Sequence, residues 1–211
     1  GGGGLRAPLA RASNNRILIA GATPGTGKRF IACNFAQVLA QSGRRVLFVD
    51  ADLRRGDDGR FAFGLGASPG LCEVLAGRIA DTRAIHVDVR PGLDVLATGR
   101  LPDFPADLLE SEAFVRVLDG CSSRYDLVVL DTAPVLVAAD AVSVALACGV
   151  VLLTVRAGQG RPGELNESVR RLRQAGVAID GLLFNGLDLE RRYQSRFHHR
   201  HRSHRTATAA G

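Results

Sequence analysis

The sequence predicts an α/β fold with a doubly wound, mainly parallel β-sheet and helices on both of its faces. Short apolar segments alternate with longer segments of helical periodicity, an order that is typical of β-α-β units. The apolar segments are rich in Val, Leu and Ile without a polar face, as in strands that are buried on both sides. A glycine-rich segment joins the first expected strand to the first expected helix, and helices that begin in such loops commonly bind anions.

The expected elements alternate along the chain, and each rests on its local pattern. Runs of Val, Ile and Leu predict strands at residues 16–20, 45–50, 93–98, 126–131, 150–155 and 181–186. Segments of helical character predict helices at residues 28–41, 70–77, 110–121, 139–147 and 163–176. Gly43 and Gly176 end the first and the last of these helices, as glycine commonly does.

The charge of the chain is concentrated in its C-terminal tail. All 21 acidic residues lie at or before Glu190, and six of the 27 Lys and Arg residues follow it, so the formal net charge of +6 belongs to the tail. A neutral body is not expected to bind nucleic acid, and the tail is the candidate segment for contact with phosphate, acidic lipid or polyanions. We expect a linker at residues 1–15, one folded domain at residues 16–189 and a basic, disordered tail at residues 190–211.

Cysteine use and hydropathy favour a cytoplasmic domain. The four cysteines form no C-x-x-C pair and lie in apolar surroundings, which is typical of free thiols in a reducing compartment. Residues 141–155 are uncharged but number only 15, fewer than the roughly 20 that a membrane-spanning helix needs. We see no signal peptide, and because position 1 is not Met we expect a piece of a longer protein.

The segment GATPGTGK (21–28) has the features of a phosphate-binding loop. Its glycines allow backbone N–H groups to converge on an anion. Lys28 is the only lysine in the chain, and its compact ammonium group suits the β- and γ-phosphates of a nucleotide better than the planar guanidinium of arginine. The residues expected to line the nucleotide site are Thr23, Pro24, Gly25, Thr26, Gly27, Lys28 and Arg29.

The residue after Lys28 departs from the usual pattern. A Ser or Thr hydroxyl normally stands here and ligates Mg²⁺, whereas Arg29 is cationic and cannot ligate a metal ion. Three explanations stay open: carboxylates elsewhere hold the Mg²⁺, or metal binding is weakened, or the site is degenerate.

Acidic residues stand at the ends of two further expected strands. Asp50 and Asp52 end LFVDAD, and Asp131 ends LVVLD. In an open parallel sheet, ligands bind beyond the carboxyl ends of the strands, so we expect these carboxylates beside the loop. Asp131 is the candidate for holding a metal-bound water, and Asp50 and Asp52 are candidates for holding the metal or accepting a hydroxyl proton.

With these motifs in place, residues 5–189 resemble the catalytic domain of the bacterial tyrosine kinases (BY-kinases) of capsule and exopolysaccharide synthesis. GATPGTGK is similar to that family's Walker A loop, VLFVDADLRRG to its Walker A′ segment and YDLVVLDTAPVL to its Walker B segment. The resemblance implies a P-loop, kinase-like domain at residues 16–189. Such a domain binds ATP and Mg²⁺ and transfers the γ-phosphoryl group to tyrosine, mostly in the tail of a neighbouring copy.

The resemblance also implies roles for individual residues. Lys28 holds phosphate, Asp50 activates the tyrosine hydroxyl, and Asp52 and Asp131 serve the metal. Asn185 stands where relatives contact the adenine. Lys28, Asp50 and Asp52 are thus the candidate catalytic residues, and Asp50, Asp52 and Asp131 are the candidate metal ligands.

The chain departs from the family pattern in its terminal segments. The family carries a cluster of tyrosines in its tail, whereas this chain has only two tyrosines in all. Tyr125 precedes an expected buried strand and is expected to be structural, and Tyr193 is the candidate phosphate acceptor. In the family, a Glu-x-x-Arg-x-x-Arg element before the first strand serves ring assembly. Only its last residue has a counterpart in this chain, Arg6, so we expect the element to be broken or lost. The related partition and division-site ATPases carry an extra lysine at the position of Thr23, and its absence argues against them.

Three functions are therefore open. The leading hypothesis is a tyrosine autokinase that regulates polysaccharide biosynthesis and export. It would act at the inner face of the cell membrane with a membrane-embedded chain-length regulator and with other copies of itself. The second hypothesis is a non-catalytic, nucleotide-binding regulatory module for such a partner, which Arg29 and the scarcity of tyrosines favour. The third is a partition-type P-loop ATPase.

Overall fold

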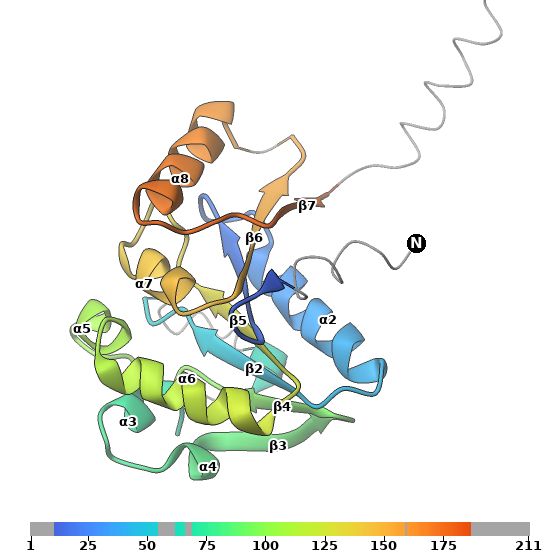
Figure 1. Cartoon of the computed structure of the whole chain (residues 1–211), viewed down its shortest axis with the longest axis vertical. Helices are drawn as coiled ribbons and strands as arrows, with labels where there is room; N and C mark the ends of the chain where they lie inside the picture. Colours follow the sequence, from blue (N-terminus) through green and yellow to red (C-terminus); the bar gives the residue numbers. More distant parts are fainter. Residues whose placement is uncertain (1–10, 55–61, 66–68, 159, 187–211) are drawn as a thin grey trace, which may run out of the picture.

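The structure, a computed structural model, describes residues 11–54, 62–65, 69–158 and 160–186. Within these ranges it contains a seven-stranded sheet in the order β3-β4-β2-β5-β1-β6-β7 (Figure 1). The strands are β1 (Arg16–Gly21), β2 (Val46–Ala51), β3 (Ile85–Arg90), β4 (Leu93–Leu96), β5 (Leu127–Thr132), β6 (Val150–Arg156) and β7 (Gly181–Asn185). Neighbouring strands are parallel except β3 and β4, which are antiparallel. The expected mainly parallel sheet is confirmed.

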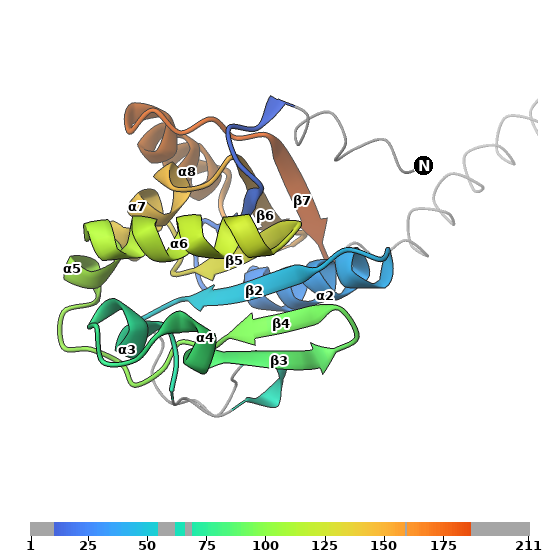
Figure 2. The same ribbon diagram turned by 60° about the horizontal axis from the view of Figure 1, so that its bottom comes forward.

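Helices cover both faces of this sheet, as expected. They are α2 (Lys28–Gln41), α3 (Leu71–Leu75), α4 (Asp81–Ala84), α5 (Pro105–Leu109), α6 (Glu112–Arg124), α7 (Asp140–Leu146) and α8 (Pro162–Gln174), with a 3₁₀ turn η1 (Ala62–Gly64). Figure 2 shows α6 in front of the sheet and α2 behind it. α2 packs through Ala32, Ala36 and Ala40, whose small side chains allow the helix to lie close to the strands.

The strand order brings three functional segments to one edge of the sheet. β5 lies between β1 and β2, and the register places Asp131 beside Ile19 of β1 and Asp50 of β2. Because these strands are parallel, their carboxyl ends meet at the same edge. The loop that follows β1 therefore lies next to the acidic ends of β2 and β5.

Three elements, β3, α4 and α5, were not expected from the sequence, nor was the turn η1. β3 is an edge strand whose side chains are half-buried or exposed. Asp88 within it has a φ of 53°, where the pairing with β4 is irregular. The sequence IHVDVR therefore lacks the continuous apolar character of a buried strand.

The uncharged segment 141–155 forms most of α7 and β6, as expected. In the part of the chain that the structure describes, no helix has the length and apolar character needed to cross a bilayer. All four cysteines are free thiols.

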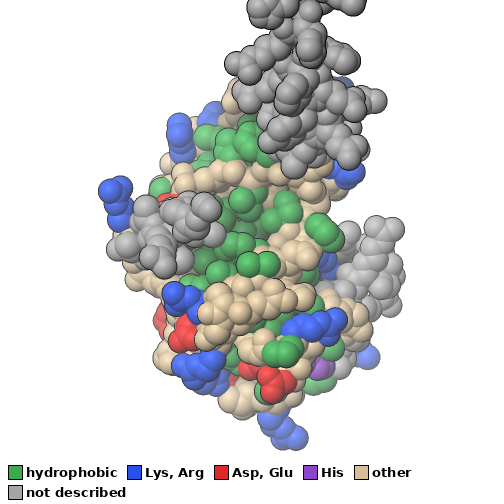
Figure 3. All heavy atoms as spheres, turned by 90° about the vertical axis from the view of Figure 1, so that its right-hand side faces the viewer, with side chains coloured by type: hydrophobic (Ala, Val, Ile, Leu, Met, Phe, Trp, Pro, Cys, Tyr) green, Lys and Arg blue, Asp and Glu red, His purple; other side chains and the backbone are tan. Residues whose placement is uncertain are grey.

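The surface beside α2 and β7 carries apolar side chains. Figure 3 shows hydrophobic groups across the middle of this face, with cationic groups scattered around them rather than gathered. Among the described residues, α2 exposes Phe30 and Val38, and β7 exposes Phe184. Exposed apolar groups of this kind favour contact with protein rather than with a polyanion.

Candidate nucleotide-binding site

Glycines shape the loop between β1 and α2. Gly25 and Gly27 have φ angles of 84° and 80°, in the left-handed region that glycine adopts readily. α2 begins directly afterwards at Lys28, and its first turn contains no acidic residue. The N–H groups at the start of α2 are therefore available to an anion.

Two neighbouring strands hold this loop in place. Thr154 Oγ1 of β6 lies 3.3 Å from Thr26 Oγ1, and Arg156 Nη1 of the same strand donates to the carbonyl oxygen of Gly25 at 3.0 Å. Asn185 Nδ2 of β7 donates to the carbonyl oxygen of Thr26 at 3.0 Å. The loop conformation is thus fixed before any ligand binds, which lowers the cost of binding.

We expect Gly27→Ala to impair nucleotide binding more strongly than Gly43→Ala. Both glycines have positive φ angles, 80° and 84°, but a Cβ at Gly27 would lie 2.1 Å from Asn185 Nδ2, whereas a Cβ at Gly43 meets nothing within 4 Å. Both variants should lose about 1–2 kcal/mol of stability for the left-handed backbone. Only Gly27→Ala should also weaken ADP binding in calorimetry, and adding Asn185→Ala should restore part of it. Equal ADP affinities of the two single variants would contradict this account of the loop.

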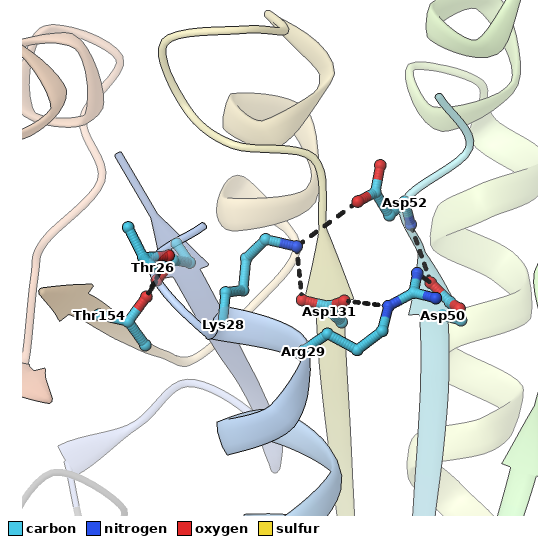
Figure 4. A network of polar contacts seen from close by, with 8 residues as sticks. Thr26, Lys28, Arg29, Asp50, Asp52, Asp131 and Thr154 are labelled. Carbon is cyan, nitrogen blue, oxygen red and sulfur yellow. Dashed lines mark hydrogen bonds and ion pairs between the residues drawn. The ribbon is translucent and has the colours of Figure 1, made fainter. Parts of the chain in front are cut away.

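Five charged side chains form a continuous series along this edge of the sheet (Figure 4). Lys28 Nζ lies 3.5 Å from Asp52 Oδ2 and 2.8 Å from Asp131 Oδ1. Arg29 Nε donates to Asp131 Oδ2 at 3.2 Å, and Arg29 Nη2 donates to Asp50 Oδ1 at 2.7 Å. The structure therefore brings the three predicted carboxylates together and interleaves two cations between them.

The five charged side chains of this series are largely buried. The side chains of Asp50, Asp131 and Arg29 are 2%, 0% and 14% exposed. Burial raises the pKa of Asp50 to about 6, with Arg29 opposing the shift and Asp131 adding to it. Burial alone lowers the pKa of Arg29, but the charges of Asp50, Asp131 and Asp52 more than offset this, so its pKa lies above the ordinary value. Buried carboxylates require a partner cation, and Arg29 provides one.

This arrangement does not fit a magnesium ion on the three carboxylates. Mg²⁺ requires an octahedron of oxygen ligands at about 2.0–2.1 Å, whereas Arg29 places N–H donors between Asp50 and Asp131. Within the described ranges, no group of three or more His, Cys, Asp or Glu residues could hold a metal ion. The assignment of Asp50, Asp52 and Asp131 as metal ligands stays a prediction, and Arg29 is the physical reason against it.

A pocket of about 720 Å³ opens over the loop, within the size range of small-molecule sites. Its lining includes the predicted loop residues and one predicted carboxylate, namely Thr23, Pro24, Gly25, Thr26, Gly27, Lys28, Arg29 and Asp52. Phe63 and Val137 add apolar surface, and Arg54 and Arg156 add positive charge. The pocket combines donors and cations for phosphates with apolar groups for a base.

Sequence reasoning did not single out Arg54, Thr154 or Arg156. Arg54 follows Asp52 by two residues and makes a two-pronged pair with Asp140, with Nε 2.8 Å from Oδ2 and Nη2 2.9 Å from Oδ1. Asp140 opens α7, so this pair ties the segment after β2 to α7 beside the pocket. The sequence could have indicated Thr154 and Arg156 by their position, because both stand at the carboxyl end of a strand that reaches the same edge of the sheet.

The remaining predicted residues lie at the margin of the site or beyond the described ranges. Asn185 contacts the loop through its hydrogen bond to the carbonyl oxygen of Thr26, and its contact with adenine stays a prediction. Tyr125 follows α6, and its hydroxyl donates to Asp94 Oδ2 at 2.6 Å, which agrees with a structural role. Tyr193 and Arg6 fall outside the residues that the structure describes.

The fold and the site together define a P-loop nucleotide-binding domain. The family described as "AAA domain" matches residues 14–161. MinD from Pyrococcus horikoshii, solved with Mg-ADP, has a TM-score of 0.67 at 23% identity over 81% of this chain and 70% of that chain. At this identity the likeness shows the fold alone.

Closer similarities are to bacterial tyrosine kinases. The putative tyrosine-protein kinase EpsB of Ralstonia solanacearum is 41% identical over 184 residues, which are 87% of this chain and 24% of that protein. The tyrosine-protein kinase etk of Escherichia coli K12 is 39% identical over 183 residues, which are 87% and 25% of the two chains. The solved kinase domain of Escherichia coli ETK has a TM-score of 0.78 at 40% identity and covers 82% of this chain and 68% of that chain.

The chain therefore belongs to the bacterial tyrosine kinase domain family. The resemblance noted from the sequence is confirmed, and a partition-type ATPase is disfavoured. The chain spans about a quarter of the length of the curated relatives named above.

Proposed function

We propose that this chain is the ATP-binding domain of a protein-tyrosine kinase that phosphorylates copies of itself and regulates capsular or exopolysaccharide biosynthesis and export. The observation that carries the proposal is the position of Lys28, the only lysine in the chain. Lys28 ends the glycine-rich loop, and its ammonium group lies beside the carboxylates of Asp52 and Asp131. The names of the relatives support it, because they describe tyrosine-protein kinases, one of them in a cps region.

In the proposed reaction, ATP binds in the pocket over the loop. Lys28 leaves its carboxylate partners and contacts the β- and γ-phosphates, while the loop N–H groups bind phosphate oxygens. The tyrosine oxygen forms a bond to the γ-phosphorus, the bond from this phosphorus to the β–γ bridging oxygen breaks, and ADP leaves. Asp50 accepts the tyrosine proton, and its pKa of about 6, raised by burial, suits this role.

The test is incubation of the full chain with ATP, with and without Mg²⁺, followed by mass spectrometry of both tyrosines. We expect phosphate on Tyr193 and none on Tyr125, whose hydroxyl is bonded to Asp94. Tyr193→Phe should abolish labelling, and Tyr125→Phe should retain it. Absence of phosphotyrosine at every protein concentration would contradict the kinase assignment.

One observation favours a second function, a non-catalytic nucleotide-binding module. Arg29 Nη2 donates to Asp50 at 2.7 Å, so the proposed base is already engaged by a cation. In this case ADP binding persists while the labelling experiment yields no phosphotyrosine. Measuring both ADP binding and tyrosine labelling therefore separates a kinase from a non-catalytic nucleotide-binding module.

The proposal extends to partners and location. A membrane-embedded polysaccharide chain-length regulator, in the same or a separate chain, would hold the domain at the inner face of the cell membrane, and copies of the domain would associate. The exposed Phe30, Val38 and Phe184 support contact with protein. The neutral charge of residues 1–190 gives no support for nucleic acid as a partner.

A further inference from the structure

We infer that Arg29 is the resident counter-cation of the phosphate site, so that this chain binds metal-free nucleotide as well as it binds the magnesium complex. The inference rests on the proposed function, since it requires that the loop bind a nucleotide. Beyond that function, it states that the site accepts the nucleotide both with and without a bound Mg²⁺.

The first support is the position of the guanidinium group. β2 and β5 are neighbours in register, with Asp50 beside Asp131, and Arg29 bonds to both carboxylates at 2.7 and 3.2 Å. Mg²⁺ would need carboxylate or hydroxyl oxygens within about 2.0–2.1 Å. A guanidinium group that donates to both carboxylates therefore excludes the ion from the space between them.

The second support is the chemistry of the residue itself. The position after the loop lysine usually supplies a Ser or Thr hydroxyl as a metal ligand. Arg29 supplies no oxygen and a permanent positive charge, so one residue both removes a ligand and adds a cation. Its planar, forked donors match carboxylate oxygens, which is why arginine rather than lysine suits this position.

The third support is the balance of charge when nucleotide binds. In the structure Lys28 and Arg29 share three carboxylates, Asp50, Asp52 and Asp131. Once Lys28 turns to the phosphates, Arg29 still pairs with Asp50 and Asp131. These two carboxylates then need no metal ion to offset their burial and their repulsion of the phosphates.

The test is calorimetry of the full chain with ADP, once in EDTA and once in excess Mg²⁺, for wild type, Arg29→Ser and Arg45→Ser. We expect the wild-type affinity to change by less than about twofold between the two conditions, whereas Arg29→Ser should bind at least about fivefold more tightly with Mg²⁺. Arg45 is the matched control because its side chain is 71% exposed and pairs with Asp126 at the opposite end of β2. Arg45→Ser should behave as wild type.

Two results would overturn the inference while leaving nucleotide binding intact. One is a wild-type affinity that rises at least about fivefold with Mg²⁺. The other is that the wild type binds no ADP whereas Arg29→Ser binds ADP in the presence of Mg²⁺. In that case Arg29 would prevent nucleotide binding rather than act as a counter-ion. If neither protein binds ADP in either condition, the proposed function itself fails. If Arg29→Ser does not fold, the comparison of wild-type ADP affinity in EDTA and in excess Mg²⁺ is sufficient to test the inference.

Discussion

Replacing Lys28 by methionine is expected to weaken ADP binding by at least about thirtyfold, which corresponds to about 2 kcal/mol or more. Methionine keeps most of the length of the side chain but removes the charge that the phosphates require. No other lysine exists in the chain to take its place, and Arg29 is held by Asp50 and Asp131. Isothermal titration calorimetry with ADP measures the effect directly.

Arg116→Met is the control for Lys28→Met. Its side chain is 69% exposed on α6 and pairs with Glu112, an exposed residue of the same helix. This variant should bind ADP as wild type does. If Lys28→Met kept its affinity within about twofold, a change of less than about 0.5 kcal/mol, the phosphates would have to bind elsewhere.

Replacing Arg29 by methionine is expected to lower the free energy of unfolding by about 3–5 kcal/mol near neutral pH. The change leaves Asp50 and Asp131 buried side by side, and among the described residues Lys28 is the remaining cation paired with Asp131. In a domain of this size the loss corresponds to a fall in Tm of roughly 6–20 °C. Chemical and thermal denaturation measure it, and Arg116→Met, which breaks an exposed pair, should lose less than about 1 kcal/mol.

The stability loss of Arg29→Met should depend on pH with a definite sign. Burial raises the pKa of Asp50 to about 6 in the folded chain, and Arg29 opposes this shift, so the variant carries a still higher pKa. A raised carboxylate pKa favours the folded state at low pH and loses that advantage as pH rises. The difference between wild type and Arg29→Met should therefore be larger at pH 8 than at pH 5. A loss below about 1 kcal/mol at both pH values would mean that Arg29 is not the counter-ion of these carboxylates.

The local parts of this site could be predicted from the sequence. Helix α2 runs from Lys28 to Gln41 as predicted, because the glycine loop before it and Gly43 after it mark its ends. Asp50, Asp52 and Asp131 were expected beside Lys28, because parallel strands bring their carboxyl ends to the same edge of the sheet. Local pattern and sheet topology suffice for these residues.

The direction in which Arg29 points could not be predicted in the same way. Its partners lie 21 and 102 residues away in sequence, and only the folded sheet brings them within reach of a long, flexible side chain. The pair between Arg54 and Asp140 and the contact of Arg156 with Gly25 also join distant segments. β3 was missed for another reason, since an edge strand with exposed polar residues lacks the apolar signal of a buried one.

The most direct test is a crystal structure of the full chain with ADP. The account predicts the β-phosphate at the loop, within hydrogen-bond distance of Lys28 Nζ and of backbone N–H groups of residues 25–28, with Arg29 still bonded to Asp50 and Asp131. A structure in which ADP binds elsewhere while Lys28 stays paired with Asp131 and Asp52 would contradict it.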